Sequence, residues 1–536
     1  MPTVISAWIG LLALASVIVA GGGEGGDATG SARPAAWIGA LGAVVVPSAS
    51  AADDHGGHSG EDDPGALHGH SALSDEPLPL LPAPKRPKPI LEIGEAFLGT
   101  GTLAQGIHIP GGAVWQPAFM LFGTFRTAVQ TFDPGGPGSS TRRTEWANRF
   151  DLFGNLYLTF TERILVGFRP LDRDGRGPGS APREFTGVNF SPEDGTDGGQ
   201  DRFNFKLQTL FFEGDFSELF PNLDKDDSAG LDYGLSIGRQ PVAFQEGLLI
   251  NDTIDAVGIT KANLKLPGTS NSRWSFLWGW NEFHRPTGAG NLPDDSAMLF
   301  GLFTETDLRS QTIEFNAAYV NADEAAGDGG YLGLTSVMSN GSRNLTLHAV
   351  GSFATGDQTQ FIDDGAVLLG ELSWTPHGSL NLAYINGFWG INHFRSIARD
   401  PTAGGPLGRT GILFAAVGLG RYGSPLSNQA DDAAGGAIGF QKFMKTQGTA
   451  AARQQLILEA GGRVSTEQDI AGRRVSAYAG AARFQRALGR RWVVVVDAFA
   501  GARTQNLAFD ETTGAPLPDD DLEFMSGGRL ELVTKL

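Results

Sequence analysis

Residues 273–281 read RWSFLWGWN, and every second side chain of this stretch is a large aromatic one. Positions 274, 276, 278 and 280 are Trp, Phe, Trp and Trp, whereas Arg273, Ser275 and Asn281 lie on the other parity. Successive side chains of a β-strand point to opposite faces, so the stretch predicts a strand with one apolar and one polar face. An apolar outer face and a polar inner face are typical of a strand that crosses a membrane in a barrel.

The same alternation continues to the C-terminus, in segments of about ten residues separated by turn-forming residues. It predicts an all-β fold, a closed antiparallel transmembrane β-barrel of about 18 strands, and leaves a count of 16 open. The sheet must close because lipid offers no hydrogen-bond partner to an open edge. The expected strands span 115–131, 144–160, 163–170, 203–214, 233–245, 254–265, 273–284, 297–306, 310–322, 331–339, 344–356, 365–375, 378–390, 435–444, 454–465, 473–487, 491–503 and 522–536.

The connections between these segments alternate between short and long. Tight turns are expected at 161–162, 305–309, 339–343, 376–378 and 489–490. Longer connections rich in Gly, Pro and Asp are expected at 171–202, 285–296, 323–330, 391–434 and 504–521. Short periplasmic turns and long extracellular loops are typical of outer-membrane barrels, so we expect this location, with both ends of the barrel in the periplasm.

The overall composition excludes several classes of protein. The 536 residues include 40 Lys and Arg, 59 Asp and Glu, and no cysteine, which gives a net charge of −19. Without cysteine there is no disulfide framework, Cys-based zinc site, thiol nucleophile or attached c-type haem. The acidic balance argues against a nucleic-acid partner, which requires a basic surface. We expect no cofactor and find no paired nucleophile and base, so we do not expect an enzyme.

The N-terminal part is expected to lie outside the barrel. Residues 1–51 contain two apolar runs and end in the small residues Ala49, Ser50 and Ala51, which predicts a cleaved signal peptide. A membrane anchor over 1–20 is the alternative. Residues 52–90 are acidic, then Pro-rich, and predict a disordered linker. Residues 91–114 are expected to form a periplasmic segment before the barrel at 115–536.

The linker also contains four of the nine histidines of the chain, interleaved with Asp and Glu. This pattern allows weak capture of a divalent metal ion, although the spacing does not resemble a closed structural site. The alternative is a solvated linker with incidental histidines. The linker is also the expected place for a periplasmic partner. The four residues are His55, His58, His68 and His70.

The C-terminal strand is expected to close the barrel. Leu530, Leu532, Thr534 and Leu536 alternate with charged residues and Val533, and the given sequence ends on this strand. Outer-membrane barrels commonly end in this way, because the insertion machinery recognises their last strand. We therefore expect that machinery and outer-membrane lipid as partners.

Charged residues on the polar parity are the candidate pore lining. Cationic side chains gather on the first seven expected strands and on the last one, whereas acids gather mainly on the later strands. Opposed charges would set up a field across the pore, and the alternative is that they only solvate it. The basic residues are Arg126, Arg149, Arg169, Lys206, Arg273 and Arg529, and the acidic ones are Asp151, Glu314, Glu371, Glu459, Asp497 and Glu531.

A short motif resembles a known family. Residues 234–240 read GLSIGRQ, followed by GLLIND at 247–252 and by Asp255. This is similar to the signature of alginate-export-like outer-membrane porins, as is the Thr-Glu-Arg turn at 161–163. The resemblance implies a barrel with an arginine-lined pore, and it adds Arg239 to the pore-lining candidates. Arg239 shares parity with apolar neighbours, so a bulge at Gly238 would be needed to turn it inward.

The connection 391–434 is a candidate plug. Its apolar run at 411–420 would be an aggregation hazard on an exposed loop, and folding into the lumen would bury it. The alternative is a further strand over 410–420.

These features predict a channel that passes hydrophilic, anionic solutes or a polysaccharide. The alternatives are a barrel sheath that docks a periplasmic electron-transfer cytochrome, and a structural outer-membrane protein. A barrel enzyme would need a buried polar triad, and an adhesin would need long repetitive loops. The sequence indicates neither feature.

Overall fold

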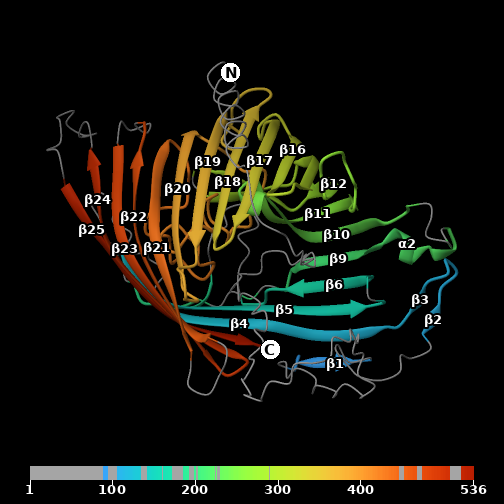
Figure 1. Ribbon diagram of the computed structural model, residues 1–536. Helices are drawn as coiled ribbons and strands as arrows, with labels where there is room; N and C mark the ends of the chain where they lie inside the picture. The colour runs from blue at the N-terminus through green and yellow to red at the C-terminus, as the bar shows by residue number, and fades with distance from the viewer. Residues whose placement is uncertain are drawn as a thin grey trace, which may run out of the picture.

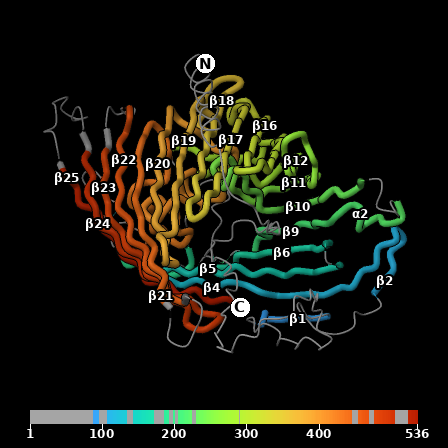
Figure 2. The backbone as a smooth tube through the Cα atoms, in the orientation of Figure 1, coloured from blue at the N-terminus to red at the C-terminus, as the bar shows by residue number. Residues whose placement is uncertain are grey.

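The computed structural model describes residues 88–94, 106–133, 142–159, 161–171, 185–191, 198–200, 203, 205–223, 225, 230–288, 290–445, 452–467, 474–506 and 521–536. Its main sheet has 21 strands, of which 18 form a closed antiparallel ring around a central lumen (Figures 1 and 2). The other three, β1, β7 and β8, extend the ring at its rims. The predicted fold class and the count of 18 are confirmed.

Every expected strand segment overlaps one strand of the ring. The 18 strands are β4 (Ala118–Asp133), β5 (Arg143–Tyr157), β6 (Arg163–Phe168), β9 (Leu207–Asp215), β10 (Tyr233–Phe244), β11 (Ile250–Lys261), β12 (Asn271–Asn281), β15 (Met298–Asp307), β16 (Gln311–Asn321), β17 (Gly329–Asn340), β18 (Arg343–Ala354), β19 (Gly365–Trp374), β20 (Leu382–Asn392), β21 (Ala433–Lys445), β22 (Ala452–Ser465), β23 (Arg474–Leu488), β24 (Trp492–Asn506) and β25 (Asp521–Lys535).

The ring closes where the last strand pairs with the first. β25 lies antiparallel to β4, and Leu536 exchanges backbone hydrogen bonds of 2.9 and 3.1 Å with Gly123. Beyond the end of β25, the short strand β1 (Leu91–Ile93) pairs with the same edge of β4 at Phe119–Leu121. Both edges of β4 are therefore paired, as an environment without water requires.

The two rims of the barrel differ in the length of their connections. β4 begins and β25 ends at one rim, where the turns 308–310, 341–342 and 489–491 lie. The connection between β9 and β10 at this rim contains α2 (Phe216–Leu219) and η2 (Pro221–Leu223). We call the rim where β4 begins and β25 ends the short-turn rim. Among the described residues, no helix is long and apolar enough to cross a membrane.

The opposite rim, which we call the long-loop rim, carries the extended connections. The hairpin of β13 (Phe283–Thr287) and β14 (Gly290–Asp294) joins β12 to β15, and residues 393–432 join β20 to β21. β7 (Thr186–Asn189) pairs with β5 at Glu145–Asn148, next to the long-loop rim, and β8 (Gly198–Gln200) pairs with β7. Two short strands, β2 (Ile107–His108) and β3 (Val114–Trp115), form a separate hairpin before β4.

Alternation along each strand separates an apolar outside from a lumen. In β12, Trp274, Phe276 and Trp278 are 42–49% exposed, whereas Ser275 and Leu277 are each 6% exposed. The exposed residues face outward, because the inward positions are covered by segments folded into the ring. The apolar parity predicted from the sequence is therefore the outer surface.

Phe276 lies midway along β12 on the outer face, so it tests the assignment to lipid. Replacing Phe276 by Arg is expected to lower the free energy of unfolding by about 2–4 kcal/mol, because a charge near the midplane must leave water. Equilibrium unfolding in urea from lipid vesicles measures this. Phe276→Leu is the matched control and should stay close to the unsubstituted protein. Equal effects of the two changes would show that Phe276 does not face lipid.

Candidate functional site

The lumen is crossed by residues 393–432, which we call the plug loop. All of these residues are described, and they contain no strand, so the alternative of a strand over 410–420 is excluded. Near its start the loop is anchored to β11, where Asp400 N donates to Asn251 O at 2.8 Å. Further along, Leu413 N donates to the Glu459 carboxylate on β22 at 2.8 Å. β11 and β22 lie on opposite sides of the ring, so the loop spans the lumen.

Apolar packing holds the plug loop against the wall. Leu413 and Phe414 are fully buried, and the Phe414 ring lies 5.4 Å from that of Phe388 on β20. The Tyr422 ring packs between Phe132 on β4 and Phe499 on β24, at 5.4 and 6.0 Å. The apolar run that would be a hazard on an exposed loop is thus buried inside the barrel.

Wall side chains also bind backbone carbonyl groups of the plug loop. Arg126 Nη2 donates to Val417 O, and Arg149 Nη1 donates to Gly418 O, each at 2.9 Å. The two arginines thus provide donors to carbonyl groups of a partly buried stretch of the plug loop.

Five charged residues form a continuous chain of ion pairs along the lumen wall, which we call the charge ladder. Arg483 Nε lies 2.7 Å from Asp497, and Asp497 accepts from Arg529 Nε at 2.8 Å. Arg529 Nη1 lies 2.8 Å from Glu531, which pairs at 2.5 Å with Arg126. The ladder crosses β23, β24, β25 and β4, so it includes the seam where the barrel closes.

A second charged group joins the wall to the plug loop. Asp151 lies 3.0 Å from both Arg149 and Arg169, and Arg169 lies 3.8 Å from Asp400 of the plug loop. Burial raises the pKa of Asp400, but Arg169, the Thr402 hydroxyl and Arg149 outweigh it and hold this pKa well below its usual range. Asp400 therefore remains a carboxylate that links the loop to this group.

The part of the lumen across from the charge ladder is acidic. Glu305 pairs with Arg273 on β12, and Glu314 on β16 lies directly across from Glu305 in the strand register. Glu371 on β19 and Glu246, in the connection η3 (Gln245–Gly247) between β10 and β11, add two further carboxylates. We call Glu246, Glu305, Glu314 and Glu371 the acidic wall.

Most of the pore-lining candidates therefore lie in the lumen, but their arrangement differs from the expected opposed walls. Positive and negative charges alternate in the charge ladder and around Asp151, because neighbouring inward positions of adjacent strands come within ion-pair distance. Glu459 holds the plug loop, and Arg273, Glu314 and Glu371 belong to the acidic side. The expected basic side is therefore a mixed network in which each of these arginines has a carboxylate partner.

Two candidates occupy a different place. Arg239 lies opposite Leu210 of β9, a residue 43% exposed on the outer face, and it pairs with Asp255 at 2.8 Å. The register of β10 with β9 and β11 is continuous at Gly238, so no bulge turns Arg239 inward. Lys206 pairs with Glu282, which also contacts Arg239. The linker histidines His55, His58, His68 and His70 lie outside the described residues.

The GLSIGRQ motif has a structural role in this arrangement. Gly238 has φ of +122°, and a Cβ there would lie 2.3 Å from Leu210 O, so only glycine fits without a shift. The next residue, Arg239, binds Asp255 on β11 through two hydrogen bonds. The motif thus ties β9, β10 and β11 together.

The contacts of three further residues of the lumen do not follow from the sequence pattern: Glu145, Glu246 and His348. Glu246 lies just beyond the expected strand 233–245, and His348 lies within the expected strand 344–356 but belongs to no sequence motif. Glu145 accepts a hydrogen bond from Arg421 N of the plug loop at 2.6 Å. The period-two pattern around Glu145 places it inward, but the contact itself depends on the path of a loop that no local pattern predicts.

Aromatic residues mark both rims on the outer surface, where they flank the apolar band of the strands. Those near the long-loop rim are Trp146, Tyr319 and Trp389, and those near the short-turn rim are Tyr233, Trp274 and Trp492. Paired aromatic girdles around an apolar band mark the two interfaces of a membrane. The molecule is an outer-membrane β-barrel.

Comparisons with solved structures find barrels of similar architecture. They include OccK5 (OpdH) from Pseudomonas aeruginosa, a BenF-like porin from Pseudomonas fluorescens Pf-5 and OccAB3 from Acinetobacter baumannii. The TM-scores are 0.46, 0.48 and 0.47 and the identities 11, 11 and 10%; the matches cover 78% of this chain and 98, 98 and 99% of those chains. This is a likeness of fold.

No family model and no curated protein sequence matches this barrel. The resemblance to alginate-export-like porins therefore finds no support in the comparisons.

Glu459 provides a test of how the plug loop is held. Glu459→Ala removes the acceptor of the Ile412 and Leu413 N–H groups, so amides of residues 409–421 are expected to exchange hydrogen about tenfold faster or more. Hydrogen–deuterium exchange with mass spectrometry measures this. Gln455→Ala is the matched control, because Gln455 lies on the same face of β22 but its side chain bonds Gln441 and Gln485 on the neighbouring strands instead of the plug loop. Unchanged exchange in Glu459→Ala would show that other contacts hold the loop.

Proposed function

We propose that this barrel is an outer-membrane channel for small hydrophilic solutes, with the plug loop as its constriction. The observation that carries the proposal is the lining at this constriction: the charge ladder and backbone groups of the plug loop lie side by side inside a closed apolar shell. A ring that served only as a scaffold would have no need of a continuous charged lining.

The size of the solute follows from the plug loop. A polymer such as a polysaccharide requires a long unobstructed lumen, whereas this loop binds opposite walls through hydrogen bonds and buried aromatic rings. Small solutes that pass beside the loop fit this geometry better. The same obstruction disfavours the alternative of a sheath around a cytochrome, because a docked protein would need the volume that the loop occupies.

The charge preference that we propose is for anions. The charge ladder contains three guanidinium groups and two carboxylates, so its local balance is positive. Fixed charges at a constriction raise the local concentration of ions of the opposite sign, most strongly at low salt. The acidic wall lies elsewhere in the lumen and opposes this preference, so the sign of the selectivity is the decisive measurement.

Arg126 allows the charge preference to be tested at one site. Arg126→Gln leaves Glu531 paired with Arg529 and makes the ladder less positive, so the reversal potential under a salt gradient should shift toward cation preference. In the double change Arg126→Gln, Glu531→Gln the net charge is restored, and the reversal potential should return close to that of the unsubstituted channel. Planar bilayer recordings measure both.

Arg239→Gln is the matched control, because it removes the same charge from the outer face. It should leave the reversal potential unchanged, with folding of all variants checked by heat-dependent gel mobility. An equal shift in Arg126→Gln and Arg239→Gln would contradict a role of the ladder in selectivity. Absence of any conductance from the folded barrel would contradict the channel itself.

A further inference from the structure

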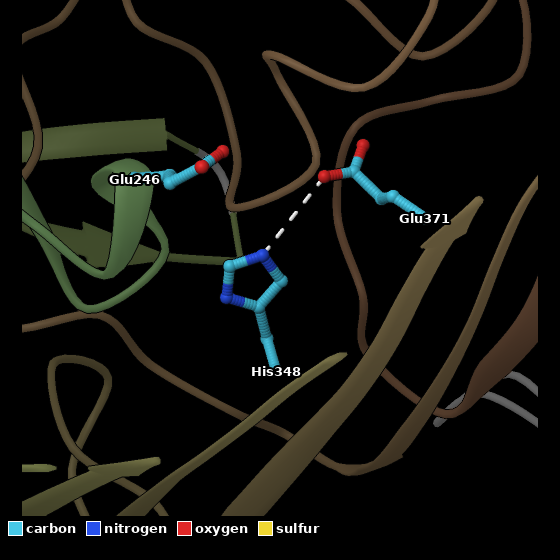
Figure 3. A group of neighbouring side chains, drawn as sticks. All are labelled: Glu246, His348 and Glu371. Atoms are coloured by element: carbon cyan, nitrogen blue, oxygen red, sulfur yellow. Dashed lines mark ion pairs between the residues drawn. The ribbon is translucent and has the colours of Figure 1, made fainter. Parts of the chain in front are cut away.

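Three side chains that could bind one cation converge at the acidic wall (Figure 3). They are Glu246 from η3, His348 from β18 and Glu371 from β19, and their nearest ligand atoms all lie within 4.8 Å of one another. His348 Nε2 lies 3.9 Å from the Glu371 carboxylate. His348 and Glu371 lie on the adjacent, paired strands β18 and β19, and the inward fold of the β10–β11 connection brings Glu246 to them.

The imidazole of His348 is buried with one nitrogen unpaired. His348 is 4% exposed, and its Nε2 has no hydrogen-bond partner among the described residues. Its Nδ1 lies 2.7 Å from Thr335 Oγ1, and that hydroxyl donates its single hydrogen to Gln245 Oε1. Thr335 therefore accepts from His348 Nδ1–H, which leaves a lone pair on Nε2 directed toward the two carboxylates.

This arrangement carries more negative than positive charge, because two carboxylates face one neighbouring guanidinium group. Two carboxylates and a neutral nitrogen lone pair face the same small space, and all three are acceptors. The nearest cation, Arg409 of the plug loop, lies 3.7 Å from Glu246 and is itself 58% exposed. A buried acceptor without a donor is costly, so a cation at the meeting point of the three groups would satisfy all of them at once.

The backbone that presents Glu246 is held in an uncommon conformation. Gln245, Glu246 and Gly247 have φ values of +54°, +51° and +85°, a region that residues with a side chain rarely adopt. Packing fixes this turn in the lumen: Phe244 stacks on Phe303 with ring centroids 3.6 Å apart, and Gly333 leaves room for the Gln245 side chain. Strained turns of this kind persist where the surrounding structure requires them, often at ligand sites.

We propose that Glu246, His348 and Glu371 form a binding site for a divalent transition-metal ion such as Zn²⁺, inside the lumen. Imidazole nitrogen with carboxylate oxygen suits Zn²⁺ and its neighbours, whereas Ca²⁺ and Mg²⁺ prefer oxygen ligands alone. Three protein ligands leave at least one coordination position for water. The ion would tie the strained β10–β11 connection to the barrel wall beside Arg409 of the plug loop.

The geometry is close to what an ion requires. Zinc bonds to nitrogen and oxygen are about 2.0–2.2 Å long, so two ligand atoms on one tetrahedral ion lie about 3.3–3.6 Å apart. The His348–Glu371 distance of 3.9 Å exceeds this by a few tenths of an ångström, which a small rotation of the Glu371 side chain can supply. Glu246 is 44% exposed and can supply the remaining movement by rotation of its side chain.

The test is metal binding to the full chain, purified without a histidine tag, stripped with a chelator and kept in detergent. His55, His58, His68 and His70 are replaced by Ala, so that the linker does not bind the probe. Calorimetric titration with Zn²⁺ is expected to show one binding site. Bound Co²⁺ is expected to give an absorption spectrum typical of a site with a nitrogen ligand. His348→Asn should weaken Zn²⁺ binding at least about tenfold and remove that spectrum.

Glu246→Gln provides a second variant: it changes an exposed side chain, so the barrel fold is not at stake, and it should also weaken Zn²⁺ binding. Glu305→Gln is the matched control, because it removes a carboxylate of the same wall outside the trio. The proposal is overturned if no stoichiometric Zn²⁺ binds, if His348→Asn and Glu246→Gln bind as the parent does, or if Ca²⁺ competes equally. None of these outcomes depends on whether the barrel conducts.

Discussion

In lipid, every backbone N–H and C=O group needs a hydrogen-bond partner within the protein, and this constraint shapes the molecule. It explains why β25 returns to β4, why Leu536 bonds Gly123, and why β1 pairs the part of β4 that β25 does not reach. Once the ring is closed, the only surfaces left to vary are the outer face, the two rims and the lumen. The outer face must be apolar, so chemical function is confined to the lumen and the rims.

Inside the ring the problem is reversed, because a barrel of this width is too large for wall side chains to fill. The plug loop, the connection between β10 and β11 and the β13–β14 hairpin carry their own buried residues, such as Phe283, Ile397 and Phe414. Each segment brings backbone carbonyl and N–H groups into the interior. Wall arginines and Glu459 satisfy those groups, so charged residues that a simple pore would use only for solvation also hold the constriction in place.

This double use explains why the lumen contains so many ion pairs. An arginine that donates to a plug-loop carbonyl is buried or partly buried and requires a carboxylate beside it, as Arg126 has in Glu531 and Arg149 has in Asp151. The trio Glu246, His348 and Glu371 differs from these groups because acceptors face acceptors there. The two parts of the lumen therefore differ in kind: one is a network of paired charges, and the other is a cluster with an excess of carboxylates.

The sequence by itself determined the strands and their faces, because period-two alternation reports directly which side of a strand meets lipid. The stretch RWSFLWGWN became β12 with Trp274, Phe276 and Trp278 outside, and all 18 expected segments became strands of the ring. The apolar run at 411–420 likewise indicated a buried loop. Parity also placed Arg126, Asp497 and Glu531 in the lumen.

Only the tertiary structure decided which charges meet. The partners Arg126 and Glu531 are 405 positions apart in sequence, and their contact exists because the barrel closes between β4 and β25. Arg239 seemed a pore residue from its motif, but the continuous register places it outside, against Asp255. The Glu246, His348 and Glu371 cluster depends on a turn with left-handed backbone that folds into the lumen. Such contacts arise from long-range closure and loop paths, which local periodicity does not encode.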